Sequence, residues 1–82
     1  MIKIVDKVLL SEGQTGLELS AWPELGEQIE FRKWASQNKF SEYLEFKNFY
    51  RAGHFGDIDY PAIQVKKDAP EEVITLTLLR WS

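Results

Sequence analysis

The 82-residue chain contains no cysteine, which excludes disulfides and thiolate metal sites and fits a reducing compartment. It has neither a Gly-x-Gly-x-x-Gly string nor a P-loop, so no sequence motif supports nucleotide binding. No apolar run is long enough for a signal peptide or a membrane-spanning helix. These absences predict a cytoplasmic protein with no cofactor and no membrane partner.

The chain also lacks an excess of basic residues. Lys and Arg number 10 against 13 Asp and Glu, and the net charge is −3. Phosphate-driven binding of nucleic acid is therefore disfavoured. The length predicts a single small globular domain over residues 1–82, and the apolar content of 44% is ordinary for one. A domain of this size has a net stability of about 3–5 kcal/mol.

Aromatic residues, by contrast, are abundant and concentrated. Nine of the eleven lie between Phe31 and Tyr60. A small domain needs only some of them to fill its core, so the others are expected on the surface. A cluster of surface aromatics is a candidate contact patch.

Three segments in the first half of the chain alternate apolar and polar residues, as strands do. The alternation predicts strands over 2–10 and 17–22, and a third over 27–35 in which Ile29 and Phe31 share a face. A helix over 27–37 is the alternative, although it would place Leu25 and Ile29 opposite Phe31 and Trp34.

Residues 41–52 are expected to form the helix. Ser41 is a suitable N-cap, and Gly53 is suited to the C′ position. The apolar stripe expected to face the sheet follows i, i+3, i+7 spacing and consists of Tyr43, Phe46 and Tyr50.

The second half is expected to add two strands. Residues 62–66 suit a short strand, and residues 72–81 suit a central one because both alternating faces are largely apolar. The predicted fold class is α+β: an antiparallel or mixed sheet in the order β-β-β-α-β-β, with one helix at about 41–52 on one face. The alternative order is ββ-αα-ββ.

One cluster resembles a metal or acid–base site, namely His54 with Asp57 and Asp59. The chain has no second histidine to complete a ligand set, and nothing resembles an activated nucleophile. These residues are therefore interpreted as loop formers. We expect no metal, no catalytic residue and no enzymatic activity.

The favoured function is that of a non-enzymatic binding protein acting through a protein–protein surface. It would serve as an inhibitor, immunity-type or adaptor protein for a larger partner, such as one that handles nucleic acid. Aromatic anchors and acidic residues that attract a basic surface would carry the binding. The candidate partner-binding residues are Trp22, Trp34, Glu42, Glu45, Phe49, Phe55, Asp57 and Asp59.

Two other functions remain open. One is a single-stranded nucleic-acid-binding module that uses aromatic stacking and cationic side chains. Its residues would be Trp34, Phe49, Arg32 and Arg51. The other is a homo-oligomeric structural protein in which the aromatic patch contacts a second copy.

Overall fold

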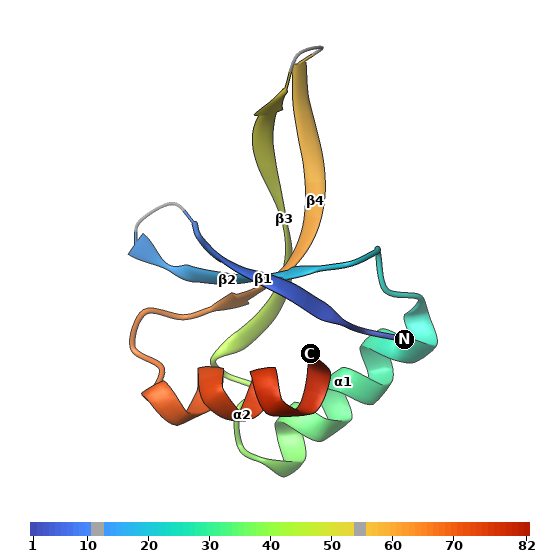
Figure 1. The fold of residues 1–82 in the computed structure, drawn as a ribbon. Coiled ribbons are helices and arrows are strands. Elements are labelled where there is room, and N and C mark those ends of the chain that lie inside the picture. The colour runs from blue at the N-terminus through green and yellow to red at the C-terminus, as the bar shows by residue number, and fades with distance from the viewer. Residues whose placement is uncertain (11–12, 54–55) are drawn as a thin grey trace.

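A computed structural model describes residues 1–10, 13–53 and 56–82 (Figure 1). Over these residues the chain forms a four-stranded antiparallel sheet in the order β1-β2-β4-β3 and two helices. Both helices lie on the same side of the sheet (Figure 1). The elements in chain order are β1 (Ile4–Leu9), β2 (Thr15–Leu19), α1 (Leu25–Gln37), β3 (Leu44–Gly53), β4 (Gly56–Val65) and α2 (Glu71–Trp81).

The α+β class and the antiparallel sheet are confirmed, but the observed order ββαββα differs from both expected orders. The strands expected over 2–10 and 17–22 correspond to β1 and β2, and residues 62–65 of the expected short strand lie in β4. None of the helices in the described part of the chain is long and apolar enough to cross a membrane.

The core lies between the sheet and the two helices, with Phe31 of α1 at its centre. The Phe31 ring centroid is 5.7 Å from that of Trp34, 5.1 Å from that of Phe46 and 5.3 Å from that of Trp81. Aromatic side chains from α1, β3 and α2 therefore meet at one point. Part of the aromatic concentration in the sequence fills the core.

The third strand expected over 27–35 is wrong, and the helical alternative for this segment is confirmed by α1. Phe31 and Ala35 are buried, whereas Ile29 is 56% exposed and Leu25 is exposed. The expectation that Ile29 and Phe31 share a face is also wrong. The apolar residues do fall on opposite sides of the helix, and the helix leaves one of those sides in solvent.

Both ends of α1 are defined by hydrogen bonds. At the start, the Glu27 carboxylate accepts a hydrogen bond from the Glu24 N–H at 3.1 Å. At the end, Lys39 adopts a positive φ of 61°, and the Phe40 N–H donates to the Ala35 carbonyl at 2.7 Å. This is a Schellman motif with lysine where glycine is usual.

The helix expected over 41–52 is wrong, because these residues form most of β3. Leu44 is buried and Phe46 half-buried, while the intervening Glu45 and the following Lys47 are exposed. Phe46 reaches the core from a strand and not from a helical stripe. Tyr50, which was expected in that stripe, is exposed.

The central strand expected over 72–81 is wrong as well, because this segment forms α2. The helix begins after Pro70, and its buried residues repeat every four positions: Val73, Thr77 and Trp81. The Thr77 hydroxyl donates to the Val73 carbonyl at 2.6 Å, which satisfies that polar group inside the core.

The helical state of α2 predicts the sign of one surface substitution. Thr75 is exposed, and its hydroxyl donates only a long bond of 3.4 Å to the Glu71 carbonyl. Thr75→Ala should raise the free energy of unfolding by about 0.5 kcal/mol, because alanine is the better helix former. Urea denaturation measures this change. In the control, Leu79→Ala at another exposed α2 position should stay within about 0.5 kcal/mol of zero. A loss of stability in Thr75→Ala would indicate a strand.

Strands β3 and β4 continue well beyond the rest of the sheet. β2 pairs with β4 only from Ala62 to Val65, whereas β3 pairs with β4 along its whole length. Among the residues described, the part of β4 before Ala62 therefore has β3 as its only strand neighbour. We call this two-stranded projection, residues 48–53 and 56–61, the arm (Figure 1).

Candidate functional site on the arm and its base

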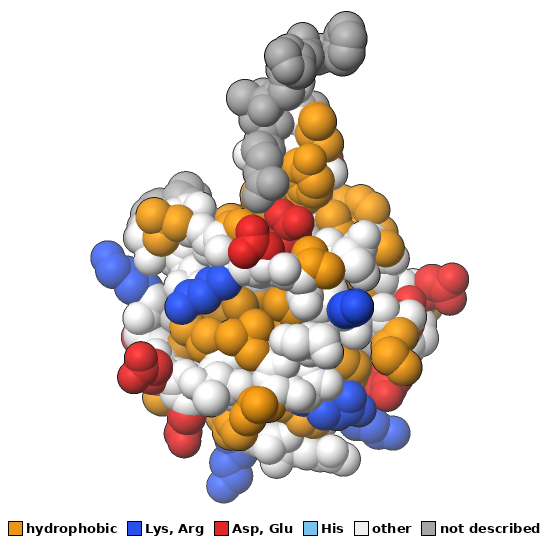
Figure 2. Space-filling view, viewed as in Figure 1, with side chains coloured by type: hydrophobic (Ala, Val, Ile, Leu, Met, Phe, Trp, Pro, Cys, Tyr) orange, Lys and Arg blue, Asp and Glu red, His pale blue; other side chains and the backbone are white. Residues whose placement is uncertain are grey.

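The arm carries apolar side chains that are open to solvent. Tyr50 is 69% exposed and Ile58 is 49% exposed. Phe49 and Tyr60 are directly opposite each other in the ladder, and their rings stack with centroids 5.5 Å apart at 28°. Figure 2 shows hydrophobic side chains along the described part of the arm and acidic side chains close to its foot. The stack stiffens the ribbon, while Tyr50 and Ile58 remain available to a partner.

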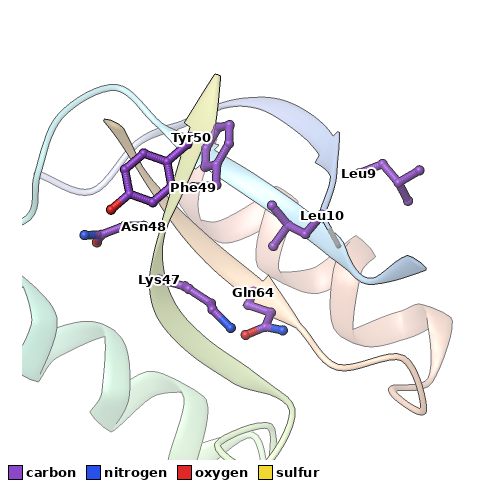
Figure 3. Close-up of a pocket in the computed structure, with 7 residues that line it drawn as sticks. All are labelled: Leu9, Leu10, Lys47, Asn48, Phe49, Tyr50 and Gln64. Atoms are coloured by element: carbon purple, nitrogen blue, oxygen red, sulfur yellow. The ribbon is translucent and has the colours of Figure 1, made fainter. Parts of the chain in front are cut away.

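A hollow of about 320 Å³ lies at the base of the arm (Figure 3). Leu9 at the end of β1 and the adjacent Leu10 line one side of the hollow, and residues of β3 line the other. Its lining residues are Leu9, Leu10, Lys47, Asn48, Phe49, Tyr50 and Gln64. The hollow is large enough for side chains of a binding partner, and it is continuous with the exposed Tyr50.

Leu10 occupies its place in this hollow because residue 16 is glycine. A Cβ atom on Gly16 would lie 2.9 Å from Leu10 Cγ, which is closer than such atoms approach. Gly16 is buried in β2 beside Gln64 of β4. The glycine therefore lets Leu10 fold over the sheet surface at the base of the arm.

The acidic candidates that the structure describes lie in the β3–β4 ribbon or directly before it. Asp59 is exposed in the arm and accepts a hydrogen bond from Asn48 Nδ2 at 3.3 Å. Glu45 is exposed near the start of β3, and Glu42 is exposed in the turn before it. A hydrogen bond with Glu42, together with its negative charge, raises the pKa of the Tyr43 phenol above its usual value.

The aromatic candidates separate into two groups. Trp22 is 54% exposed and lines a smaller hollow of about 120 Å³ at the foot of the arm, with Asn48 and Pro61. Trp34 instead packs into the core, with its ring 5.9 Å from Phe40 and 5.8 Å from Trp81. Trp34 is thus poorly placed to anchor a partner.

Other expected site residues are placed only in part. Asp57 pairs with Ala52 in the arm. Phe55 and His54 lie outside the described residues. The candidate cluster of His54, Asp57 and Asp59 therefore lies partly outside them as well. Within residues 1–10, 13–53 and 56–82, no group of three potential metal ligands is close enough to hold an ion.

The residues expected to bind single-stranded nucleic acid do not form one platform in the described structure. The Arg32 guanidinium lies 5.7 Å from the centre of the Phe46 ring, beside α1. Trp34 belongs to the core, and Phe49 stacks on Tyr60 in the arm. Stacking of successive bases needs aromatic faces that follow one another along a groove.

Sequence reasoning missed Leu9, Leu10, Tyr50 and Ile58 as site residues. The expected helical stripe assigned Tyr50 to the interior, and the segment that contains Ile58 was expected to be a loop. The exposure of Tyr50 and Ile58 follows from the length of the β3–β4 ribbon, which no local pattern reveals. No protein-family model, curated protein sequence or solved structure matches this chain.

Proposed function

We propose that this chain is a non-enzymatic binding protein that contacts another protein through the arm and its base. An inhibitor, an immunity-type protein and an adaptor all act in this way. The observation that carries the proposal is the exposure of Tyr50 and Ile58 on a projecting ribbon, next to a hollow lined partly by leucines. Tyrosine on a rigid support is a preferred interface anchor.

Acidic residues in the arm and before it along β3 favour a partner with a basic surface. Asp59 lies in the arm, and Glu42 and Glu45 lie towards the opposite end of β3. Acidic groups at the rim of a contact chiefly raise the association rate and select partners of opposite charge. Tyr50 would supply most of the affinity and the carboxylates most of the selectivity, while Ile58 lies on the opposite face of the ribbon.

Site-specific photo-crosslinking tests where the partner binds. A benzophenone amino acid is placed at Tyr50 and, as the control, at Leu79, which is exposed on α2. After irradiation in native lysate, a defined protein adduct should form at position 50 and not at position 79. Equal adducts at both positions, or a nucleic-acid adduct at position 50, would contradict the proposal.

The identified partner then allows a quantitative measurement. Tyr50→Ala should weaken binding by about tenfold or more, as expected for an interface anchor, whereas Leu79→Ala should leave the affinity unchanged. Asp59→Lys should slow association, and the difference from the wild type should shrink as salt is added. Titration calorimetry and surface-based kinetics measure these quantities.

A further inference from the structure

The outer side of β3 is an open sheet edge. β3 is the last strand in the sheet order, and among the described residues no strand pairs with its other side. The Lys66 N–H donates to the Tyr43 carbonyl at 2.9 Å, next to the Leu44–Val65 pair. Backbone groups in an antiparallel strand point alternately to either side. This bond therefore identifies which residues of β3 direct their N–H and C=O groups towards β4.

The alternation determines which residues of β3 offer backbone groups to a strand added at the open edge. Like Tyr43, Glu45 and Lys47 direct their N–H and C=O groups towards β4. Leu44, Phe46 and Asn48 therefore direct theirs towards the open edge. The position of Pro61 opposite Asn48 agrees with this assignment. Proline has no N–H to donate to β3, and Asn48 directs its own backbone groups away from β4.

Side chains at this edge have a charge pattern centred on Phe46. Phe46 faces the core and α1, while Glu45 and Lys47 are exposed on the opposite face of the sheet. A strand added antiparallel would need a basic residue opposite Glu45 and an acidic one opposite Lys47. In chain order that pattern is acidic, apolar, basic, which is the sequence Glu45-Phe46-Lys47 itself.

We propose that two copies of this chain associate through β3, antiparallel, with Phe46 opposite Phe46 of the second copy. In this register Phe46 exchanges both backbone hydrogen bonds with its counterpart, and Leu44 bonds with Asn48 of the second copy. Glu45 then lies opposite Lys47 of the second copy in a non-hydrogen-bonded pair, where side chains are closest. The two-fold symmetry forms this ion pair twice.

A hollow lies beside the edge, next to Phe46. Its volume is about 200 Å³, and it is lined by Phe31, Arg32, Ala35, Ser41, Leu44, Glu45 and Phe46. Three of these are consecutive in β3, so the hollow reaches the edge of the strand and not only one face. In the proposed dimer the Phe46 side chains of both copies lie next to each other on the helix side of the joined sheet, beside this hollow.

The proposed contact uses Leu44–Asn48 and shares Lys47 and Asn48 with the hollow at the base of the arm, whereas Tyr50 and Ile58 lie farther along the ribbon. β3 runs for ten residues and contains no proline, so every residue at its open edge keeps a backbone N–H that a second strand can use. A second copy covers this edge and enlarges a small domain's apolar interior.

Charge reversal at the edge tests the register. Sedimentation velocity over a concentration series should show a monomer–dimer equilibrium for the wild type. Glu45→Lys and Lys47→Glu each place like charges opposite one another at two sites, and each should weaken association by about tenfold or more. The double variant Glu45→Lys/Lys47→Glu restores opposite charges and should dimerise like the wild type.

Mixing provides a second test that does not depend on folding differences. Equimolar Glu45→Lys and Lys47→Glu chains have complementary edges and should form a heterodimer that neither forms alone. Glu71→Lys, an exposed change on α2, is the control and should leave dimerisation unaltered. A wild-type monomer at every concentration, failure of the double variant to recover, or an equal effect of Glu71→Lys would overturn the proposal.

Discussion

Replacement of Phe31 by alanine is expected to unfold most of the protein. Phe31 is 2% exposed, and its ring meets those of Trp34, Phe46 and Trp81. Removal of a buried phenylalanine costs about 3–5 kcal/mol. This equals the whole stability of about 3–5 kcal/mol expected for a domain of this size. Near-UV circular dichroism should lose its aromatic signal, and urea denaturation should show a strongly reduced midpoint.

Ile29→Ala on the same helix is the matched control. Ile29 is only two positions away but is 56% exposed, so its truncation should change the free energy of unfolding by about 0.5 kcal/mol or less. The contrast between the two variants is specific to a helix, because a strand would place both residues on one face. Similar losses for Ile29→Ala and Phe31→Ala would contradict the helical structure of α1.

Ile63→Ala is expected to have the second large effect. Ile63 is fully buried in the part of β4 that lies between β2 and β3. Truncation of a buried isoleucine to alanine costs about 2–5 kcal/mol, because it loses burial and leaves a cavity. Thermal and urea denaturation, both monitored by tryptophan fluorescence, should show a single transition at a much lower midpoint.

The same substitution farther up the strand provides the comparison. Ile58 lies in the arm at 49% exposure, so Ile58→Ala should cost less than about 1 kcal/mol. If Ile58→Ala destabilised the protein as much as Ile63→Ala, the arm would be packed against the body and the exposed apolar surface on it would not exist.

The fold class and the first two strands are predictable because period-2 alternation in the first twenty residues has no competing pattern. In the segment 41–52 the same residues satisfy two periods. Phe46 and Tyr50 are four apart, which suits a helix, while Leu44 and Phe46 are two apart, which suits a strand. The contact of Phe46 with Phe31 selects the strand, and that contact lies far away in sequence.

The two helices were obscured by different features. In α2, two largely apolar alternating faces suggested a central strand, but Thr77 meets its hydrogen-bonding need within the helix through Val73. In α1, the termination signal is Lys39 in a conformation usually taken by glycine. In both cases packing against the sheet overrides the local preference.

The candidate site was predictable only in its residue types. Phe49, Asp59, Glu42 and Glu45 were identified as partner-binding, and all belong to or adjoin the β3–β4 ribbon. Tyr50 was assigned to the core. It is exposed because β3 and β4 extend past β2, and the sequence does not reveal how far they extend. That difference in strand length is a property of the assembled sheet.

The sheet register also determines the order in which the fold can be assembled. β3 and β4 are adjacent in sequence, so their pairing brings together residues close in the chain at little entropic cost. β2 must instead find β4 across the whole α1–β3 segment, since Thr15 pairs with Val65. The β3–β4 pair is therefore a local contact, whereas the β2–β4 pair closes a long loop and accounts for the larger entropic cost of forming this sheet.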